Sequence, residues 1–272
     1  MPELPEVDTI RSQLAPVLAG RQLLDGWSSP SAKFVDAIEA IGATVDAVTR
    51  QGKYLILPLD DGRELVVHLG MTGSLRILPA PAEGVPPDPY VRASWNLSGG
   101  GTLVYRDVRQ FGRIAVVDAG RYSSLPTLAA LGPDPFDEAF DGDALWTALR
   151  RSDRHLKTQL LSQRPVAGVG NIYADEAFWL AGVHPADRRI TRARAATLAD
   201  AIRTALRSGL DHGGTTLRDY VDADGATGGN QHHLFCYGRA GEPCERCSTP
   251  LRRGVLDART TTWCPTCQPR RR

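Results

Sequence analysis

Apolar residues near the start of the chain recur at the spacing of a helix. In LPEVDTIRSQLAPVLAG (4–20), Val7, Ile10, Leu14 and Val17 lie three or four positions apart. Residues at this spacing share one helix face, because an α-helix turns once every 3.6 residues. The stretch therefore predicts an amphipathic helix that buries these four side chains.

From residue 20 to about residue 118, short apolar runs alternate with turns rich in Gly, Pro and Asp. The runs are GKYLILPL, ELVVHLGM, SLRIL, TLVYRD and GRIAVVDA. Runs of this length that are rich in β-branched and aromatic residues are typical of strands. Many short strands at such spacing predict a β-sandwich or a barrel. The Pro-rich stretch 79–89 predicts an exposed loop.

Helical periodicity returns after LGPDPFDEAFDG (131–142), which we interpret as the domain connection. Helices are predicted in DALWTALRR (143–151), around Leu156, Leu160 and Leu161, in NIYADEAFWLAG, and over 191–209. We therefore predict an α+β protein. Its domains are a β-sandwich with an N-terminal helix at 1–130, a linker at 131–142, a helical domain at 143–234 and a small cysteine module at 235–272.

The C-terminal module carries the most specific motif, CERC…CPTC. Its two pairs, Cys244 with Cys247 and Cys264 with Cys267, are separated by sixteen residues. Zinc prefers four soft ligands in a tetrahedron, and each CxxC turn supplies two thiolates. The intervening LRRGVLDARTTTW is long enough for a β-hairpin. Two disulfides are the alternative, which is unfavourable in a reducing cytosol. We predict one structural zinc ion in a closed site of four cysteines, and a buried apolar role for Cys236.

The net charge of +1 conceals an asymmetry between the two halves of the chain. Residues 151–272 hold 19 Lys and Arg against 12 Asp and Glu, whereas residues 1–150 hold 13 against 19. A basic half suits a polyanionic partner, although basic surface is often only solvated surface. No apolar run approaches the ~18–20 residues of a membrane helix, and no signal peptide precedes the acidic start. We expect a cytosolic protein without membrane contact.

The start, MPELPE, permits a structural and a chemical interpretation. Proline and acidic residues are favourable in the first turn of a helix, where they complement its dipole. If Met1 is removed, however, Pro2 becomes a free secondary amine. An α-amino group has a pKa of roughly 7.7–8.0, so much of it is neutral and nucleophilic at working pH. Such an amine can attack a sugar C1′ and form a Schiff base, with Glu3 and Glu6 close enough to move protons.

A glycine turn interrupts the helical half at PVAGVGNIYADEAFWLAGVHP (165–185). Gly168 and Gly170 permit a tight turn and a close approach of backbone N–H groups to an anion. Asn171 follows, and it either caps the next helix or donates its amide to a phosphate. On this stretch alone, a simple corner between two helices is an equally good interpretation.

Together these stretches resemble the formamidopyrimidine-DNA glycosylases, bacterial base-excision enzymes that remove oxidised purines. The resemblance runs almost end to end. It rests on PELPEV, GKYL, HLGMTG, YRDVRQFG, LGPDPF, GVGNIYADE, GGTTLRDY, YGRAGEPC and ARTTTWCPTCQ. Several of these motifs are long and occur in the same order as in the family. The helical domain at 143–234 then resembles the family's helix–two-turn–helix DNA-binding domain, and 235–272 its zinc finger.

The resemblance implies catalytic roles for residues at both ends of the chain. Pro2 is similar to the nucleophile that forms the Schiff base, Glu3 to the acid that protonates the opening sugar, and Glu6 to a supporting carboxylate. Lys53 is similar to the lysine that contacts phosphate and assists elimination. Asn171 and Arg259 resemble the pair that clamps the phosphates on either side of the everted nucleotide.

Further residues resemble the family's DNA contacts. Met71, Arg109 and Phe111 match the side chains that fill the gap left by a flipped base, although Phe111 alone reads as an ordinary core aromatic. Tyr90 stands where a histidine is expected and can donate to a phosphate. The basic contact before the glycine turn is assigned to Arg151, Arg154 or Lys157, and Lys157 fits the pattern best.

The resemblance implies a bifunctional DNA glycosylase and abasic-site lyase that acts as a monomer, in a bacterial cytoplasm and on the nucleoid. Its partner is double-stranded DNA with oxidised purines, such as 8-oxoguanine and formamidopyrimidines, or with abasic sites. The loop DADGATGGNQHHLF (222–235) has Gly228, Gly229 and Asn230 where the family often has Gly followed by two aromatic residues, and this departure concerns substrate preference. Two alternatives remain: an endonuclease VIII-type enzyme for oxidised pyrimidines, and a zinc-finger lesion-binding protein without catalysis.

Overall fold

The computed structural model describes residues 2–79 and 88–270, which form two compact units. The first unit contains Met1–Ala129 and His212–Gly229, and the second contains Ala130–Asp211 and Asn230–Arg272. The predicted loop at 79–89 lies mostly outside the described residues.

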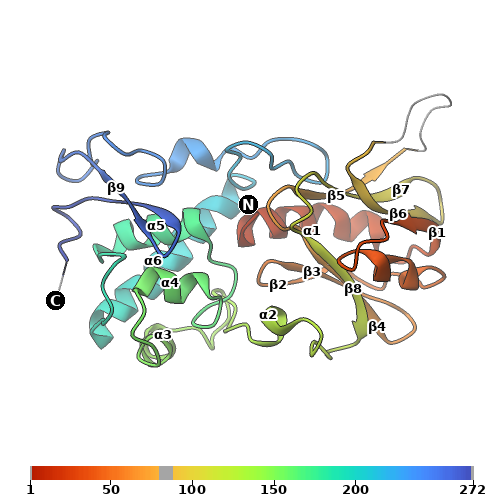
Figure 1. The fold of residues 1–272 in the computed structure, drawn as a ribbon, viewed down its shortest axis with the longest axis horizontal. Helices are drawn as coiled ribbons and strands as arrows, with labels where there is room; N and C mark the ends of the chain where they lie inside the picture. The colour runs from red at the N-terminus through yellow and green to blue at the C-terminus, as the bar shows by residue number, and fades with distance from the viewer. Residues whose placement is uncertain (1, 80–87, 271–272) are drawn as a thin grey trace. The chain divides into compact units, whose positions relative to one another are not determined.

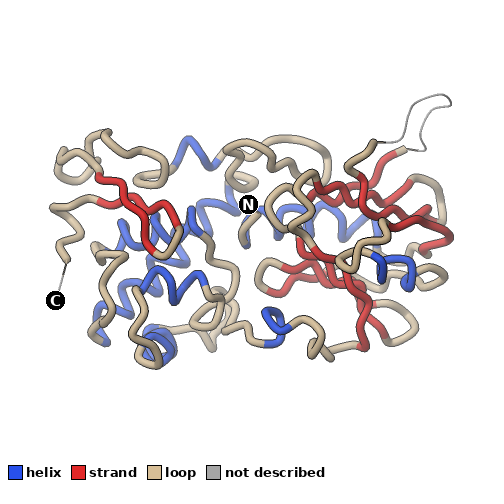
Figure 2. The backbone as a smooth tube through the Cα atoms, viewed as in Figure 1, coloured by secondary structure: helices blue, strands red, loops and turns tan. Residues whose placement is uncertain are grey.

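Two antiparallel four-stranded sheets make up the first unit (Figure 2). One sheet has the order β1 (Leu23–Ser28), β6 (Val91–Leu97), β7 (Thr102–Asp107), β5 (Gly73–Leu78). The other has the order β2 (Thr49–Gln51), β3 (Tyr54–Pro58), β4 (Arg63–His68), β8 (Arg113–Asp118). Apolar side chains of both sheets share one core, in which Trp95, Tyr105 and Leu65 are almost fully buried. The predicted β-sandwich is therefore confirmed.

The predicted N-terminal helix is α1 (Leu4–Leu18), which packs against β2, β3 and β5. Val7, Ile10 and Leu14 are buried as predicted, but Val17 is 51% exposed and Leu18 is fully buried instead. Leu18 follows Leu14 by four residues and so stays on the same face, whereas Val17 has turned away from it. The prediction for Val17 was wrong by one position.

The five predicted strand runs correspond to β3, β4, β5, β7 and β8. Three strands were missed: β1 with the sequence LLDGWS, β2 with TRQ and β6 with VRASWNL. Asp25 and Gly26 of β1 and Asn96 of β6 lie within the paired parts of these strands, although Asp, Gly and Asn are uncommon in strands. Their pairing with neighbouring strands outweighs that local preference. The short helices η1 (Val35–Ala40) and α2 (Pro126–Ala129) complete the unit.

The segment 212–229 belongs to the β-sandwich unit, whereas the predicted boundaries placed it in the helical domain. Tyr220 and Ala223 are buried in the core of the sandwich. The Ala223 N–H donates to Gln13 Oε1 at 2.9 Å, which fixes the segment to α1. The apolar residues of this segment are not regularly spaced, because it is neither a helix nor a strand. The sequence therefore did not reveal where they are buried.

The second unit contains the helices that the sequence predicted. They are α3 (Gly142–Leu149), α4 (Leu156–Leu161), α5 (Asn171–Ala181) and α6 (Arg192–Asp211), with a short η2 (Asn230–His233). α6 packs against both α3 and α5 (Figure 1). α5 ends at Gly182, whose φ of 62° is the left-handed geometry of a helix C-cap. Across 2–79 and 88–270, the helices lack the combined length and apolar character of a membrane span.

The predicted hairpin of the tail is formed by β9 (Arg252–Leu256) and β10 (Arg259–Trp263). Its two-residue turn consists of Asp257 and Ala258, with φ of 45° and 64°. Two positive φ angles define the turn type that matches the twist of a hairpin. β10 packs against α5, so the hairpin and the glycine turn before α5 form one local structure.

Candidate functional site

The N-terminal Pro2 and Glu3 are buried at the start of α1, where Glu6 fixes the backbone. The Glu3 N–H donates to Glu6 Oε2 at 2.7 Å, and the Thr215 N–H donates to Glu6 Oε1 at 2.7 Å. Glu6 thus accepts one bond from its own helix start and one from the 212–229 segment. The first residues of the chain are held between these two elements.

Glycines bring the 212–229 segment into direct contact with Glu6. Gly214 has a φ of 87°, and a Cβ there would lie 2.9 Å from Glu6 Cγ. A Cβ on Gly228 would lie 2.2 Å from the Gly214 carbonyl oxygen, so no other residue fits without a backbone shift. The Gly228 N–H donates to Thr216 Oγ1 at 2.9 Å. Glycine is therefore required at position 228, where two backbone segments cross beside the N-terminus.

Lys53 lies in the turn between β2 and β3, after Gly52, and is 7% exposed. Arg50 connects this turn to the second turn of α1. Its Nε donates to Asp8 Oδ1 at 3.1 Å, and its Nη1 donates to the Gly52 carbonyl at 3.2 Å. The structure therefore attaches the turn that carries Lys53 to α1, the helix that begins just after Pro2 and Glu3.

His68, at the end of β4, was not predicted as a site residue. Burial, together with the positive charge of Lys53, lowers the pKa of His68 to about 4. Its ring lies 4.7 Å from that of Tyr54, and its Nδ1 accepts from the Gly70 N–H at 3.2 Å. A neutral imidazole beside a lysine is thus part of this region. The HLGM motif contains it, but only the fold shows that Lys53 is near.

Met71 and Phe111 lie on two loops that touch each other. A Cβ on Gly70 would lie 2.4 Å from the Phe111 carbonyl carbon, which shows how closely the loops approach. Phe111 is 51% exposed, and the Arg109 guanidinium lies 4.7 Å from its ring centroid. The alternative of an ordinary core aromatic is therefore wrong for Phe111. Met71 is half-buried and Arg109 is exposed.

Asp107 is the buried carboxylate that holds these loops, and sequence reasoning missed it. It accepts from Thr72 Oγ1 at 2.5 Å and from the Gly112 N–H at 2.8 Å. Thr72 Oγ1 in turn accepts from the Arg109 N–H at 3.0 Å. The Asp107 N–H donates to the carbonyl of Tyr90, a residue that is 40% exposed. The only sign of this role in the sequence was the position of Asp107 inside the motif YRDVRQF.

In the second unit, Asn171 and Arg259 come from α5 and β10 and lie close together. Gly170 occupies the N-cap of α5, so Asn171 does not cap the helix. The Asn171 Nδ2 donates to the Thr260 carbonyl at 3.1 Å, next to the exposed Arg259. Within the described part of the chain, Asn171 Oδ1 is buried without a hydrogen-bond partner.

The Lys157 side chain is buried against the hairpin strand β10 and does not lie on the surface. It is 1% exposed. Its Nζ donates to Asp175 Oδ1 at 2.6 Å, to the Thr260 carbonyl at 3.0 Å and to Thr261 Oγ1 at 2.9 Å. The predicted surface contact of Lys157 with a phosphate is therefore corrected, because its ammonium is enclosed by protein acceptors. Arg154 is exposed, and its contact with DNA stays a prediction.

Two acidic residues on α5 anchor the tail. Asp175 Oδ2 accepts from the Thr262 N–H at 2.9 Å. Burial raises the pKa of the Asp175 carboxyl, and the Lys157 ammonium opposes that shift. Glu176 accepts from three consecutive N–H groups, those of Phe235, Cys236 and Tyr237, at 2.8, 2.9 and 2.7 Å. Both acids lie within the motif GVGNIYADE, but their buried roles were not predicted.

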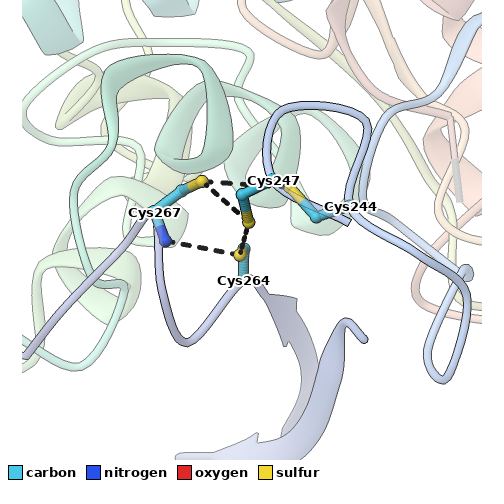
Figure 3. A group of neighbouring side chains, drawn as sticks. All are labelled: Cys244, Cys247, Cys264 and Cys267. Carbon is cyan, nitrogen blue, oxygen red and sulfur yellow. Dashed lines mark hydrogen bonds between the residues drawn. The ribbon is translucent and has the colours of Figure 1, made fainter. Parts of the chain in front are cut away.

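The four predicted cysteines converge, and each pair comes from its own turn (Figure 3). Their sulfurs all lie within 4.8 Å of one another, with Cys247 3.5 Å from Cys264 and 3.4 Å from Cys267. Zn–S bonds of about 2.3 Å in a tetrahedron place sulfurs about 3.8 Å apart. The donor set therefore fits one zinc ion and leaves no position for substrate.

Trp179 of α5 connects the zinc site to the helices. Its Nε1–H donates to Cys244 Sγ at 3.3 Å, and its ring stacks on Phe235 at 4.8 Å between centroids. The Arg246 guanidinium lies 4.1 Å from the Trp179 ring centroid. Cys236 is fully buried, as predicted, and its Sγ donates to the Thr262 carbonyl at 3.0 Å.

Three family models match consecutive parts of the chain. The formamidopyrimidine-DNA glycosylase N-terminal domain matches residues 1–114, and the H2TH domain of the same enzymes matches 131–221. The zinc finger found in FPG and IleRS matches 241–270. These matches agree with the β-sandwich, the glycine turn and the cysteine site described above.

Full-length relatives carry the same family name. The formamidopyrimidine-DNA glycosylase of Deinococcus radiodurans is 42% identical over 284 residues, which cover 100% of this chain and 98% of that protein. The crystal structure of the MutM (Fpg) protein of Thermus thermophilus superposes with a TM-score of 0.90 at 41% identity, covering 100% of both chains. A Lactococcus lactis Fpg variant in complex with Fapy-dG-containing DNA has a TM-score of 0.89 at 32% identity, covering 99% of this chain and 100% of that one.

Proposed function

The chain belongs to the formamidopyrimidine-DNA glycosylase family, and we propose that it excises oxidised purines from double-stranded DNA and then cuts the strand. Its relatives bear that enzyme's name, and one solved relative is bound to DNA that contains Fapy-dG. The cysteine site holds one structural zinc ion. We place the enzyme in the bacterial cytoplasm, where it acts on DNA as a monomer.

Base excision begins with the imino nitrogen of Pro2, once Met1 has been removed. The nitrogen forms a bond to C1′ of the damaged nucleotide, and the glycosidic bond breaks as the base leaves. Glu3 gives a proton to the ring oxygen while the sugar opens, and an iminium at C1′ results. The burial of Pro2 and Glu3 at a helix N-terminus supports this role, because that environment disfavours a protonated amine.

Strand cleavage follows from the same intermediate. The iminium makes the C2′ protons acidic, so loss of one proton expels the 3′ phosphate by β-elimination. A second elimination, the δ step, expels the 5′ phosphate. Lys53 neutralises phosphate charge near the lesion and assists elimination. Its connection to α1 through Arg50 supports its place beside the nucleophile.

The remaining site residues hold the distorted duplex. Arg259 and Asn171 bind the phosphates on either side of the everted nucleotide, and Tyr90 and Arg154 contact phosphates further out. Met71 and Phe111 fill the vacated space, while Arg109 pairs with the orphaned base. The exposure of Phe111 supports this proposal, since a half-exposed aromatic ring beside a guanidinium is available for stacking on bases.

The single observation that carries the proposal is the buried Pro2–Glu3 start, fixed by Glu6 between α1 and the 212–229 segment. A lesion-binding protein without catalysis has no use for such a constrained terminus. An oxidised-pyrimidine enzyme of the endonuclease VIII type would share it. The family name of the relatives favours purines.

Excision from matched duplexes tests the proposal. We expect release of 8-oxoguanine and formamidopyrimidines to exceed release of an oxidised pyrimidine from the same sequence context. Glu3→Gln should lose base excision and retain more nicking at preformed abasic sites, because those sites need no base departure. Preference for the pyrimidine would support the endonuclease VIII alternative. Equal loss of both activities would remove Glu3 from the acid role.

A further inference from the structure

A basic cleft lies in the helical unit, outside the site proposed above. Its volume is about 530 Å³, and its lining residues are Trp146, Arg150, Arg189, Ile190, Thr191 and Arg192. We refer to these six residues as the arginine cleft. It is formed by the C-terminal end of α3 and the segment that leads into α6. None of its residues takes part in the proposed chemistry.

The arginine cleft combines an aromatic ring with three guanidinium groups. The Arg150 guanidinium lies 4.5 Å from the Trp146 ring centroid, and that of Arg192 lies 5.9 Å away. Guanidinium groups present planar sets of donors that match phosphate oxygens. A half-buried tryptophan beside them offers a flat surface for a sugar or a base. The cleft is therefore chemically suited to a nucleotide backbone.

The acidic partners of these arginines are exposed and replaceable. Arg192 pairs with Asp143, whose side chain is 53% exposed, and Arg189 pairs with Asp153, which is 79% exposed. Ion pairs at such exposed positions contribute little to stability. Binding of the arginines to a DNA phosphate releases counterions condensed on the DNA, so the phosphate competes effectively with Asp143 and Asp153. The two ion pairs thus hold the guanidinium groups near the cleft without blocking it.

Hydrogen bonds connect the arginine cleft to the hairpin that carries Arg259. At the hairpin tip, Asp257 Oδ2 lies 3.1 Å from His155 Nδ1. The exposed Arg154 precedes His155, and the neighbouring Asp153 carbonyl accepts from Arg188 Nη1 at 3.0 Å. Arg189 follows and lines the cleft. A series of exposed arginines therefore extends within one compact unit from the hairpin to the cleft.

We propose that the arginine cleft is a second phosphate site, which binds the backbone of the same DNA duplex beyond the lesion. The inference rests on the proposed function, because it takes Arg259 as a phosphate contact. The ligand is a phosphodiester held by Arg150, Arg189 and Arg192, with its deoxyribose against Trp146. The continuity with the hairpin favours DNA over an acidic peptide. The cleft adds affinity and takes no part in bond breaking.

Binding of duplexes of two lengths tests this site. The short duplex covers only the lesion and its flanking phosphates, and the long duplex extends well beyond them. In the full-length, zinc-loaded Arg150→Gln/Arg189→Gln/Arg192→Gln variant, we expect binding of the long duplex to weaken about tenfold at low salt. The slope of log K against log salt should fall by about 1, since one phosphate contact contributes about 0.9. Binding of the short duplex and the excision rate should stay unchanged.

Controls separate this site from general charge and from the proposed function. Arg121→Gln removes an exposed, ion-paired arginine of the other unit. This variant should bind both duplexes as the wild type does. An undamaged long duplex should show the same loss, because phosphate contacts carry no base information. Equal weakening on both lengths, or wild-type binding of the long duplex, would overturn the site. Failure of the wild type to excise lesions counts against the proposed function alone.

Discussion

Lys157 and Asp175 form an ion pair in the helical unit, with side chains 1% and 0% exposed. Removal of one partner leaves an uncompensated buried charge, which typically costs about 3–5 kcal/mol. We expect Lys157→Met to lower the free energy of unfolding by that order in urea titrations. The double variant Lys157→Met/Asp175→Leu should recover much of the loss, because an apolar pair leaves no charge behind.

An exposed ion pair is the matched control for this prediction. Arg121 and Asp118 are 79% and 67% exposed, and Arg121→Gln should change the free energy of unfolding by less than about 1 kcal/mol. If Lys157→Met unfolds like the wild type, the ammonium is not enclosed as the contacts with Thr260 and Thr261 indicate.

The half-buried imidazole of His68 gives the folding free energy a defined dependence on pH. Its pKa is lowered from 6.5 to about 4 by burial and by Lys53. As pH falls, the imidazole of His68 is protonated in the unfolded chain before it is protonated in the folded protein. The contribution of His68 to the free energy of unfolding is therefore complete above pH 6.5. It is then lost as pH falls from 6.5 toward 4. Unfolding titrations should show a shallower loss over that window in His68→Gln, while the exposed His232→Gln should follow the wild type.

Single residues were predictable from the sequence where the chemistry depends on spacing. The zinc cysteines needed only the two CxxC turns. Lys157 was misassigned, because no local pattern distinguishes a buried lysine from the exposed Arg154 three residues earlier. Asp107 and Glu176 were missed for the same reason. Their partners are backbone N–H groups or side chains that only the fold brings near.

At the scale of elements, the hairpin β9–β10 depends on supports at both of its ends. The four cysteines hold its base, and Trp179 donates to one of them. Lys157 and Asn171 both donate to the Thr260 carbonyl beside Arg259. Loss of zinc should therefore release Arg259 together with the hairpin, because a structural zinc site contributes folding energy directly.

We predict that Trp179→Phe weakens zinc binding about 10- to 100-fold, because groups that hydrogen-bond to metal ligands tune the affinity by this amount. Competition with a chromophoric chelator measures it. DNA affinity should fall at the same chelator concentration at which zinc is released. Trp27→Phe, which changes an exposed tryptophan of the other unit, is the control. Full DNA binding by the zinc-free protein would contradict the hairpin's dependence on zinc.

Elements with regular periodicity were predictable, and those stabilised by pairing alone were not. The helices α1, α3, α5 and α6 and five strands follow from the spacing of apolar residues. β2 has only the residues TRQ, and it forms because β3 supplies its hydrogen bonds. The turn at Asp257 and Ala258 contains no glycine, although both residues have positive φ. The cysteine spacing implied the hairpin, but not the geometry of its turn.

At the scale of the whole molecule, the proposed site residues come from both units. The unit with Pro2, Glu3 and Lys53 contains the β-sandwich, and the unit with Asn171 and Arg259 contains the zinc hairpin. The asymmetry of charge indicated which half suits a polyanion. The boundary was less predictable, because the chain crosses back at 212 to complete the surroundings of Glu6.

Borohydride trapping on a lesion-containing duplex, followed by mapping of the modified peptide, tests the central claim most directly. Reduction converts the iminium to a stable amine and so marks the attacking nitrogen. We predict one covalent adduct, on the nitrogen of residue 2 in protein that has lost Met1, and none with Pro2 acetylated. An adduct on Lys53, or full excision by protein that retains Met1, would contradict the account.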